Sequence, residues 1–184
     1  ADAQQAQEEV NAATKMQAVW RGKQARKETG GEACITVGLR MRPFVPHELK
    51  KGPCEACITI SSNVVKVAPE AGLDEKEAKE GPWKFDKVMD SSNDKSAVFV
   101  DNAKCYDLMG RGMIDDVLAG FNTCLFCYGQ TGTGKTTTIM GDEHNGPGIL
   151  RRLLDDIFLE AERLRKEGAE VNVEMQMLEV YNEE

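Results

Sequence analysis

The sequence lacks the features that mark membrane proteins and most nucleic-acid-binding proteins. No apolar run approaches the roughly 20 residues that a helix needs to span a bilayer, and no signal peptide opens the chain. The 23 basic residues are outnumbered by 31 acidic ones, which gives a net charge of −8. A phosphate backbone is bound by basic surfaces, so this balance argues against nucleic acid as the general partner. We predict neither a membrane nor a nucleic acid as a partner.

Histidine is also scarce, with two residues in the chain, and this bears on the six cysteines. Two pairs have CxxC spacing, Cys54/Cys57 and Cys124/Cys127. No histidine or further cysteine pair accompanies Cys54/Cys57 at the spacing usual for zinc. The second pair lies in a strand-like run, where residues three apart point to opposite faces and cannot share one ion. We therefore predict free thiols, as in a reducing cytosol.

What the chain does contain is enough apolar sequence for a globular core. Apolar residues make up 41% of the 184 residues and charged residues 29%. A start at Ala1 rather than Met is typical of an incomplete sequence. Strands alternating with helices predict an α/β layered sheet. In the first half, the patterns predict a helix over 1–29 ended by a hinge at Thr29-Gly30-Gly31, strands at 34–42 and 83–88, a hairpin around Ser61-Ser62-Asn63 and a surface loop at 68–82. In the second half, they predict a helix from an Asp94 cap to about 119 stopped by Gly120, and a fully buried strand at 123–128. A helix from Lys135, interrupted at 141–148 and resumed at 149–166, and a strand at 171–181 follow.

The stretch from Gly129 to Thr136, GQTGTGKT, fits the pattern GxxxxGK[ST] and lies between a predicted strand and a predicted helix. Glycines let the backbone curl until successive N–H groups point inward at an anion. The following helix adds its positive end. Lys135 would then reach phosphate oxygens, and the Thr136 hydroxyl would ligate Mg²⁺. The loop lacks the G-x-G-x-x-G fingerprint of a dinucleotide site.

The flanking sequence resembles the motor domain of kinesins. The segment VLAGFNTCLFCYGQTGTGKTTTIMG is similar to the stretch around the kinesin phosphate loop, and ITVGLRMRPF is similar to the first strand with its R-x-R-P end. FDKVMD, GILRRLLDDIF and MLEVYNEE match further kinesin segments in order and spacing. The resemblance covers about residues 34–184. It implies a P-loop NTPase fold, here a partial three-layer sheet with flanking helices preceded by an extended N-terminal helix.

The resemblance also implies a set of nucleotide-binding residues for ATP and Mg²⁺. Arg40 and Pro43 would border the adenine, and Thr136 would hold the magnesium. Thr137 stands where kinesins usually place an aromatic residue or histidine, and a threonine offers no ring to stack on the base. The whole expected set is Arg40, Pro43, Gly129, Gln130, Thr131, Gly132, Thr133, Gly134, Lys135, Thr136 and Thr137.

The kinesin segments that sense the γ-phosphate and position the attacking water would lie beyond Glu184. These are the N-x-x-S-S-R-S-H and D-x-x-G sequences. We therefore expect no catalytic residue within this chain and no ATP hydrolysis by it alone, since phosphoryl transfer depends on those positioned groups. The chain resembles about the first half of a motor. In the complete protein the resemblance implies ATP-driven movement along microtubules, in the cytoplasm on the cytoskeleton.

MQAVWRGKQAR, from Met16 to Arg26, is similar to the IQ motif, which reads hydrophobic-Q-x-x-x-R-G-x-x-x-R. Met16, Val19 and Trp20 fall at helical spacing and form an apolar stripe. The basic side chains offer charge to an acidic partner, such as calmodulin or a related light chain. The residues expected to bind it are Met16, Gln17, Trp20, Arg21, Gly22 and Arg26. An ordinary basic amphipathic helix is the alternative.

These patterns together predict two parts, an IQ-like helix with its hinge over 1–31 and the N-terminal portion of a kinesin-type motor domain over 32–184. Two other readings stay open. One is a different P-loop enzyme, such as a small-molecule kinase or a myosin. The other is a non-enzymatic, calmodulin-regulated module that binds nucleotide without turnover.

Overall fold

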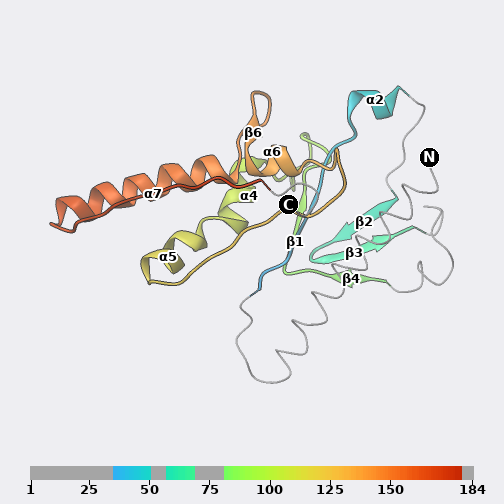
Figure 1. Ribbon diagram of the computed structural model, residues 1–184. Helices are drawn as coiled ribbons and strands as arrows, with labels where there is room; N and C mark the ends of the chain where they lie inside the picture. The colour runs from blue at the N-terminus through green and yellow to red at the C-terminus, as the bar shows by residue number, and fades with distance from the viewer. Residues whose placement is uncertain (1–34, 51–56, 69–80, 180–184) are drawn as a thin grey trace, which may run out of the picture.

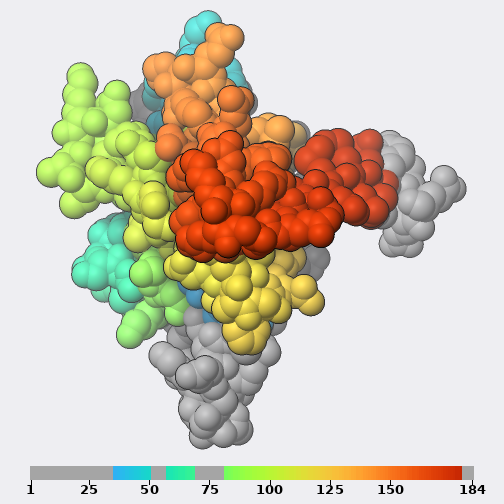
Figure 2. Space-filling view, turned by 90° about the vertical axis from the view of Figure 1, so that its left-hand side faces the viewer, coloured from blue at the N-terminus to red at the C-terminus, as the bar shows by residue number. Residues whose placement is uncertain are grey.

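A computed structural model describes residues 35–50, 57–68 and 81–179 of the chain. The predicted helix 1–29 with its hinge, the IQ-like residues, Cys54 and most of the loop predicted at 68–82 lie outside the described residues. Figure 1 shows the helices between residues 102 and 166 gathered on one side of a central pair of strands, with a small separate sheet and the short helix at 46–49 on the other; Figure 2 turns the helical side toward the viewer.

The central pair is β1 (Gly38–Met41) and β5 (Lys87–Asp90), which run parallel with Leu39 opposite Val88. The strand predicted at 34–42 exists, but it is shorter. Asp86 extends the pairing beyond β1, because its carboxylate accepts a hydrogen bond from the Val37 N–H at 2.7 Å. A parallel pair requires a long crossover between its strands, and the small sheet lies within that crossover.

The small antiparallel sheet has the order β2-β3-β4, formed by Ile58–Ser61, Val64–Val67 and Trp83–Lys84. The predicted hairpin around Ser62 is confirmed. The single strand predicted at 83–88 is wrong, because the chain divides it between two sheets: Trp83 pairs with Val65, whereas Lys87 pairs with Gly38. A short helix, α2 (Pro46–Leu49), follows β1.

The helix predicted from Asp94 to 119 is two helices, α4 (Asn102–Met109) and α5 (Gly112–Leu118). Asp94 is not the cap. Asp101 has extended backbone and accepts the Lys104 N–H at 2.7 Å, and it is this bond that starts the helix. The two helices separate at Gly110, which fits closely on the ring of Tyr106. Gly120 has a φ of +88° and ends α5, as predicted.

The helix that begins at Lys135 is short, α6 (Lys135–Ile139). The predicted interruption is confirmed and consists of a two-stranded hairpin, β6 (Gly141–Asp142) with β7 (Gly146–Pro147). The chain then enters α7 (Ile149–Lys166), whose bounds match the prediction. No helix in the described part of the chain is both long and apolar enough to cross a membrane.

The strands predicted at 123–128 and 171–181 are not formed within the described residues. Residues 123–128 alternate between partly buried and exposed side chains, so the expected burial on both faces is wrong: Phe126 is 76% exposed. Residues 171–179 turn back beside the end of α7, where Arg165 holds the Val171 carbonyl at 2.6 Å. Met177 and Leu178 stand in solvent. A strand needs a partner for its backbone groups, and neither segment has one among the described strands.

The core lies between β5 and the helices α4 and α7. Met89, Cys105, Tyr106 and Ile149 form its buried cluster, and Leu125 packs against it from the segment before the glycine loop. Thus the start of the loop is anchored to the core. Cys57, Cys105, Cys124 and Cys127 are free thiols, as predicted. Among the described residues no group of three or more His, Cys, Asp or Glu could hold a metal ion.

Candidate functional site

The glycine loop Gly129–Gly134 connects the segment packed on the core to α6. Its three glycines all have positive φ, +155° at Gly129, +83° at Gly132 and +92° at Gly134, a region that other residues rarely adopt. A side chain at Gly129 would also meet the Thr133 hydroxyl at 2.6 Å. The sequence therefore bends here because glycine alone tolerates this backbone path.

The loop closes on itself through Thr133. The Thr133 hydroxyl and N–H both donate to the carbonyl of Gln130, at 2.8 and 3.4 Å. No other protein group in the described residues accepts a hydrogen bond from the backbone N–H of Thr131, Gly132, Gly134, Lys135 or Thr136. A row of amides without a protein acceptor among the described residues is what an anion requires of a backbone cradle.

Lys135 completes this arrangement from the first turn of α6. Its Nζ donates to two carbonyls of the loop, Gly129 O at 2.7 Å and Gln130 O at 2.6 Å. The ammonium is half-buried and makes no ion pair among the described residues. The loop therefore encloses a positive charge whose partners are neutral carbonyl oxygens.

Arg40 lies beneath α6 rather than in the loop. Its guanidinium donates to Ser91 Oγ at 2.9 Å, to Asn102 Oδ1 at 2.8 Å and to Thr138 Oγ1 at 3.0 Å. The Thr138 hydroxyl in turn donates to Gly134 O at 2.9 Å. Arg40 is thereby connected to the last glycine of the loop, and its Nη2 donates to nothing in the described part of the chain.

The remaining residues of the expected set lie around the same loop. The chain at Arg42 passes beside Gly134, since a Cβ on that glycine would lie 3.9 Å from Arg42 Cβ, and Pro43 follows it, exposed. Thr136 is exposed at the start of α6. Thr137 is partly buried, and its backbone carbonyl accepts a hydrogen bond from the Asn102 amide at 3.2 Å. Hydrogen bonds, chiefly from Asn145, lower the pKa of Asp142.

A bidentate ion pair fixes the chain after Pro43. Arg42 Nη2 and Nη1 contact the two carboxylate oxygens of Glu48 at 2.6 and 2.9 Å, and Glu48 also accepts the Val45 N–H at 2.9 Å. The hydrogen bonds from Arg42 and then from Val45 lower the pKa of Glu48 to about 2. This pair holds α2 against the end of β1.

Sequence reasoning missed Asn102 and Ser91, which are 1% and 4% exposed and hold Arg40. Neither belongs to a recognisable motif. The only available signal was an asparagine directly after an aspartate cap, and that pattern is typical of a helix start rather than of a site.

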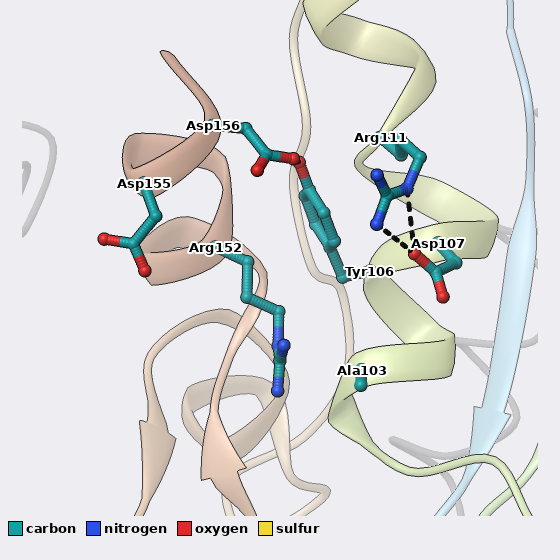
Figure 3. A pocket seen from close by; sticks show the side chains of 7 residues that line it. All are labelled: Ala103, Tyr106, Asp107, Arg111, Arg152, Asp155 and Asp156. Atoms are coloured by element: carbon teal, nitrogen blue, oxygen red, sulfur yellow. Dashed lines mark hydrogen bonds and ion pairs between the residues drawn. The ribbon is translucent and has the colours of Figure 1, made fainter. Parts of the chain in front are cut away.

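A hollow of about 210 Å³ lies between α4 and α7, away from the glycine loop. Figure 3 shows Tyr106 pointing to Asp156 across it, with Arg111 paired to Asp107 on the α4 side. Burial, followed by the hydrogen bond to Asp156, raises the pKa of Tyr106 to about 12. Each acid or base there has a protein partner or faces solvent, so this hollow is a polar junction between two helices.

The fold and loop define a class, a mixed helix-and-sheet protein with a glycine-rich phosphate-type loop between core segment and helix. The family model for the kinesin motor domain matches residues 40–184. The chain belongs to the kinesin motor domain family. A model of the IQ calmodulin-binding motif matches residues 10–29, which contain the segment predicted to be IQ-like.

Curated relatives agree with this assignment. The chain is 35% identical over 155 residues to kinesin-like protein KIN-14H of Arabidopsis thaliana, which covers 82% of this chain and 14% of that protein. It is 34% identical to kinesin-related protein 13 of Dictyostelium discoideum, over 83% of this chain and 11% of the relative. It is 30% identical to human kinesin-like protein KIF14, over 81% of this chain and 9% of the relative. The chain thus spans about a tenth of the length of these relatives.

Solved kinesin structures share the fold. A KIF14 motor segment, solved with ADP in complex with a microtubule, aligns with a TM-score of 0.61 and 27% identity over 70% of this chain and 34% of that one. A dimeric KIF14 state with AMP-PNP on a microtubule aligns with the same TM-score over 71% of this chain and 34% of that one. The predicted fold class, a partial kinesin-type P-loop fold, is confirmed.

Proposed function

We propose that the loop Gly129–Thr136 binds the phosphates of ATP, with Lys135 supplying the positive charge. The observation that carries the proposal is the position of Lys135. Its ammonium lies inside the curled backbone of the loop and donates its hydrogen bonds to neutral carbonyl oxygens, those of Gly129 and Gln130. A phosphate oxygen is a stronger, charged acceptor for that ammonium than a carbonyl. Triphosphate binding would therefore replace the hydrogen bonds between Lys135 and the loop carbonyls.

The proposal extends to the magnesium and the base. Thr136 offers an exposed hydroxyl oxygen beside the loop, and hard cations such as Mg²⁺ take oxygen ligands, with phosphate and water supplying the rest. Arg40, Pro43 and Thr137 lie around the same loop and would border the adenine, with Arg40 held by its bonds beneath α6. Thr137 offers no ring, so base contacts here would be weaker than stacking.

The test for the loop is the binding of a fluorescent ATP analogue to the chain and two variants. Lys135→Ala removes the ammonium and is expected to abolish binding at micromolar nucleotide. Lys104→Ala is the matched control, because Lys104 also donates its ammonium to a backbone carbonyl, Phe99 O at 2.8 Å, but lies on α4. Unchanged affinity in Lys135→Ala, or equal loss in both variants, would contradict the assignment.

For the whole protein we propose an ATP-driven motor on microtubules, associated with the cytoskeleton. Its support is the family match and the two KIF14 structures, which are complexes of those proteins with microtubules. The division of this chain at residue 31 into an IQ-like segment and a motor portion is part of the same proposal. Co-sedimentation of the whole protein with microtubules, strong with AMP-PNP and weaker with ADP, tests it; absence from the pellet in both states would count against a motor.

The IQ match at 10–29 supports calmodulin or a related light chain as a partner. A peptide of residues 1–30 titrated with calmodulin, with and without Ca²⁺, measures this directly. A Trp20→Ala peptide should bind more weakly, since Trp20 would be the large apolar anchor. If the unmodified peptide fails to bind in either state, this partner is excluded.

A further inference from the structure

Asn102 is buried to 1% exposure and connects four segments of the chain. Its amide oxygen accepts a hydrogen bond from Arg40 Nη1 of β1 at 2.8 Å. Its amide nitrogen donates to the carbonyl of Thr137 in α6 at 3.2 Å and to that of Gly146 in β7 at 3.1 Å. Both amide hydrogens and the oxygen are thus used, from the first residue of α4.

These bonds continue to the glycine loop. Arg40 also donates to the Thr138 hydroxyl, which donates to the carbonyl of Gly134. A continuous chain of hydrogen bonds therefore runs from Asn102 through Arg40 and Thr138 to the last glycine of the loop. Ser91 holds the other side of the guanidinium, so Arg40 has little freedom to adopt a second position.

We propose that Asn102 is a positioning residue for the nucleotide loop. It fixes the position of α6 relative to β1, and thereby the positions of Gly134 and Lys135. The proposal rests on the proposed function in so far as it concerns nucleotide affinity. An amide is the one group of this size that can accept from an arginine and donate twice to carbonyls. It acts through Arg40 and Thr138 and touches no nucleotide itself.

The same amide ties the β6–β7 hairpin to α6, because Thr137 and Gly146 share its two hydrogens. Loss of those donors would leave two partly buried carbonyls without their partner, which costs more than the bonds themselves contribute. The disturbance should therefore be local to α6 and the hairpin. A residue that only filled space in the core would loosen the whole fold instead.

The test uses the complete chain with two variants and a control. Asn102→Asp keeps the size and the acceptor for Arg40 but turns both donors into an acceptor facing carbonyls. Thr138→Val keeps the shape of that side chain and breaks the relay between Arg40 and Gly134. Asn93→Asp makes the same chemical change as the first variant at an exposed turn, where the oxygen that accepts the Lys95 N–H is retained.

Two quantities are measured on each protein. The first is amide hydrogen exchange without nucleotide, at Thr138 in α6, at Met140 directly after α6 and at Gly148 after the hairpin, compared with amides of α7. The second is the dissociation constant of a fluorescent ATP analogue. We expect Asn102→Asp to speed exchange about tenfold at the first three sites only and to raise the dissociation constant about tenfold. Thr138→Val should act in the same direction, less strongly, and Asn93→Asp should change neither.

Unchanged exchange at α6 in Asn102→Asp and Thr138→Val, or faster exchange throughout the chain, overturns the positioning role. Local acceleration with unchanged nucleotide affinity also overturns it. If the unmodified chain binds no nucleotide while α6 and the hairpin alone exchange faster in the variants, the proposed function fails and the positioning of α6 by Asn102 stands.

Discussion

Lys135 reaches back across the glycine loop to Gly129, with its Nζ 2.7 Å from the carbonyl oxygen six residues before it in the chain. Lys135, the residue expected to bind the phosphates, therefore joins the two ends of the loop. An ammonium held by carbonyls is already partly desolvated. It is consequently ready for a charged acceptor, and phosphate oxygens meet that requirement.

The turn between α6 and the hairpin depends on Gly141. A Cβ there would lie against the carbonyl of Gly146 and the N–H of Gly148, both backbone atoms that cannot move aside, and φ is +84°. We expect Gly141→Ala to lower the free energy of unfolding by about 3 kcal/mol or more, since backbone overlap adds to the cost of left-handed backbone.

Gly146→Ala is the matched control for that substitution, because Gly146 also has positive φ, +73°, yet nothing lies within 4 Å of its added Cβ. Gly146→Ala should lower the free energy of unfolding by only about 1–2 kcal/mol, which is the conformational cost alone. Urea unfolding of both variants measures the difference. Equal losses would show that the close approach at Gly141 is not a constraint in solution.

The Arg42–Glu48 pair predicts a pH-dependent stability. The pKa of Glu48 in the folded chain, about 2, lies below the ordinary value of 4.5, so folding favours the carboxylate form of Glu48. As the pH falls below about 4.5 the unfolded chain takes up this proton before the folded chain does, and stability is lost progressively towards pH 2. Above pH 4.5 the contribution is present in full.

The measurement is the free energy of unfolding from pH 7 to pH 2 for the chain and for Glu48→Gln. The difference between the two proteins should shrink as the pH falls through that window. Glu162→Gln removes the same charge from an exposed position on α7 and controls for net charge. A difference that stays constant with pH would refute the role of the ion pair.

Tyr106 joins α4 to α7 through its hydroxyl, which donates to Asp156. Tyr106→Phe keeps the ring in the core and removes this bond to a charged acceptor, so we expect a loss of about 1.5–3 kcal/mol in unfolding free energy. Tyr128→Phe, at a residue that is 45% exposed, should cost much less. Thermal unfolding compares the two, and equal effects would mean that the Asp156 contact contributes nothing.

Local patterns predicted the elements whose signals are self-contained. The period of 149–166 is helical throughout, and the structure begins and ends α7 at the predicted residues. The hairpin at Ser62 and the glycine stop at Gly120 follow from turn chemistry that adjacent residues determine. The family resemblance was readable for the same reason, because its motifs are continuous in sequence.

The failures arise where structure depends on distant partners. Residues 123–128 are apolar enough for a buried strand, but strands are made by pairing, and no described strand lies beside them. Asp94 and Asp101 are equally good caps by composition, and the packing of Cys105 and Tyr106 into the core selects the later one. The bonds of Arg40 to Ser91, Asn102 and Thr138 join residues 51 to 98 positions away, beyond any local pattern.

The most direct test of the phosphate loop is to record backbone amide chemical shifts of the chain while ATP with Mg²⁺, or adenosine as the control, is added. We predict large shifts with ATP at Thr131, Gly132, Gly134 and Lys135, whose amides have no protein acceptor among the described residues, and little change at those positions with adenosine. Shifts confined to the hollow between α4 and α7, or equal shifts with adenosine and ATP, would contradict it.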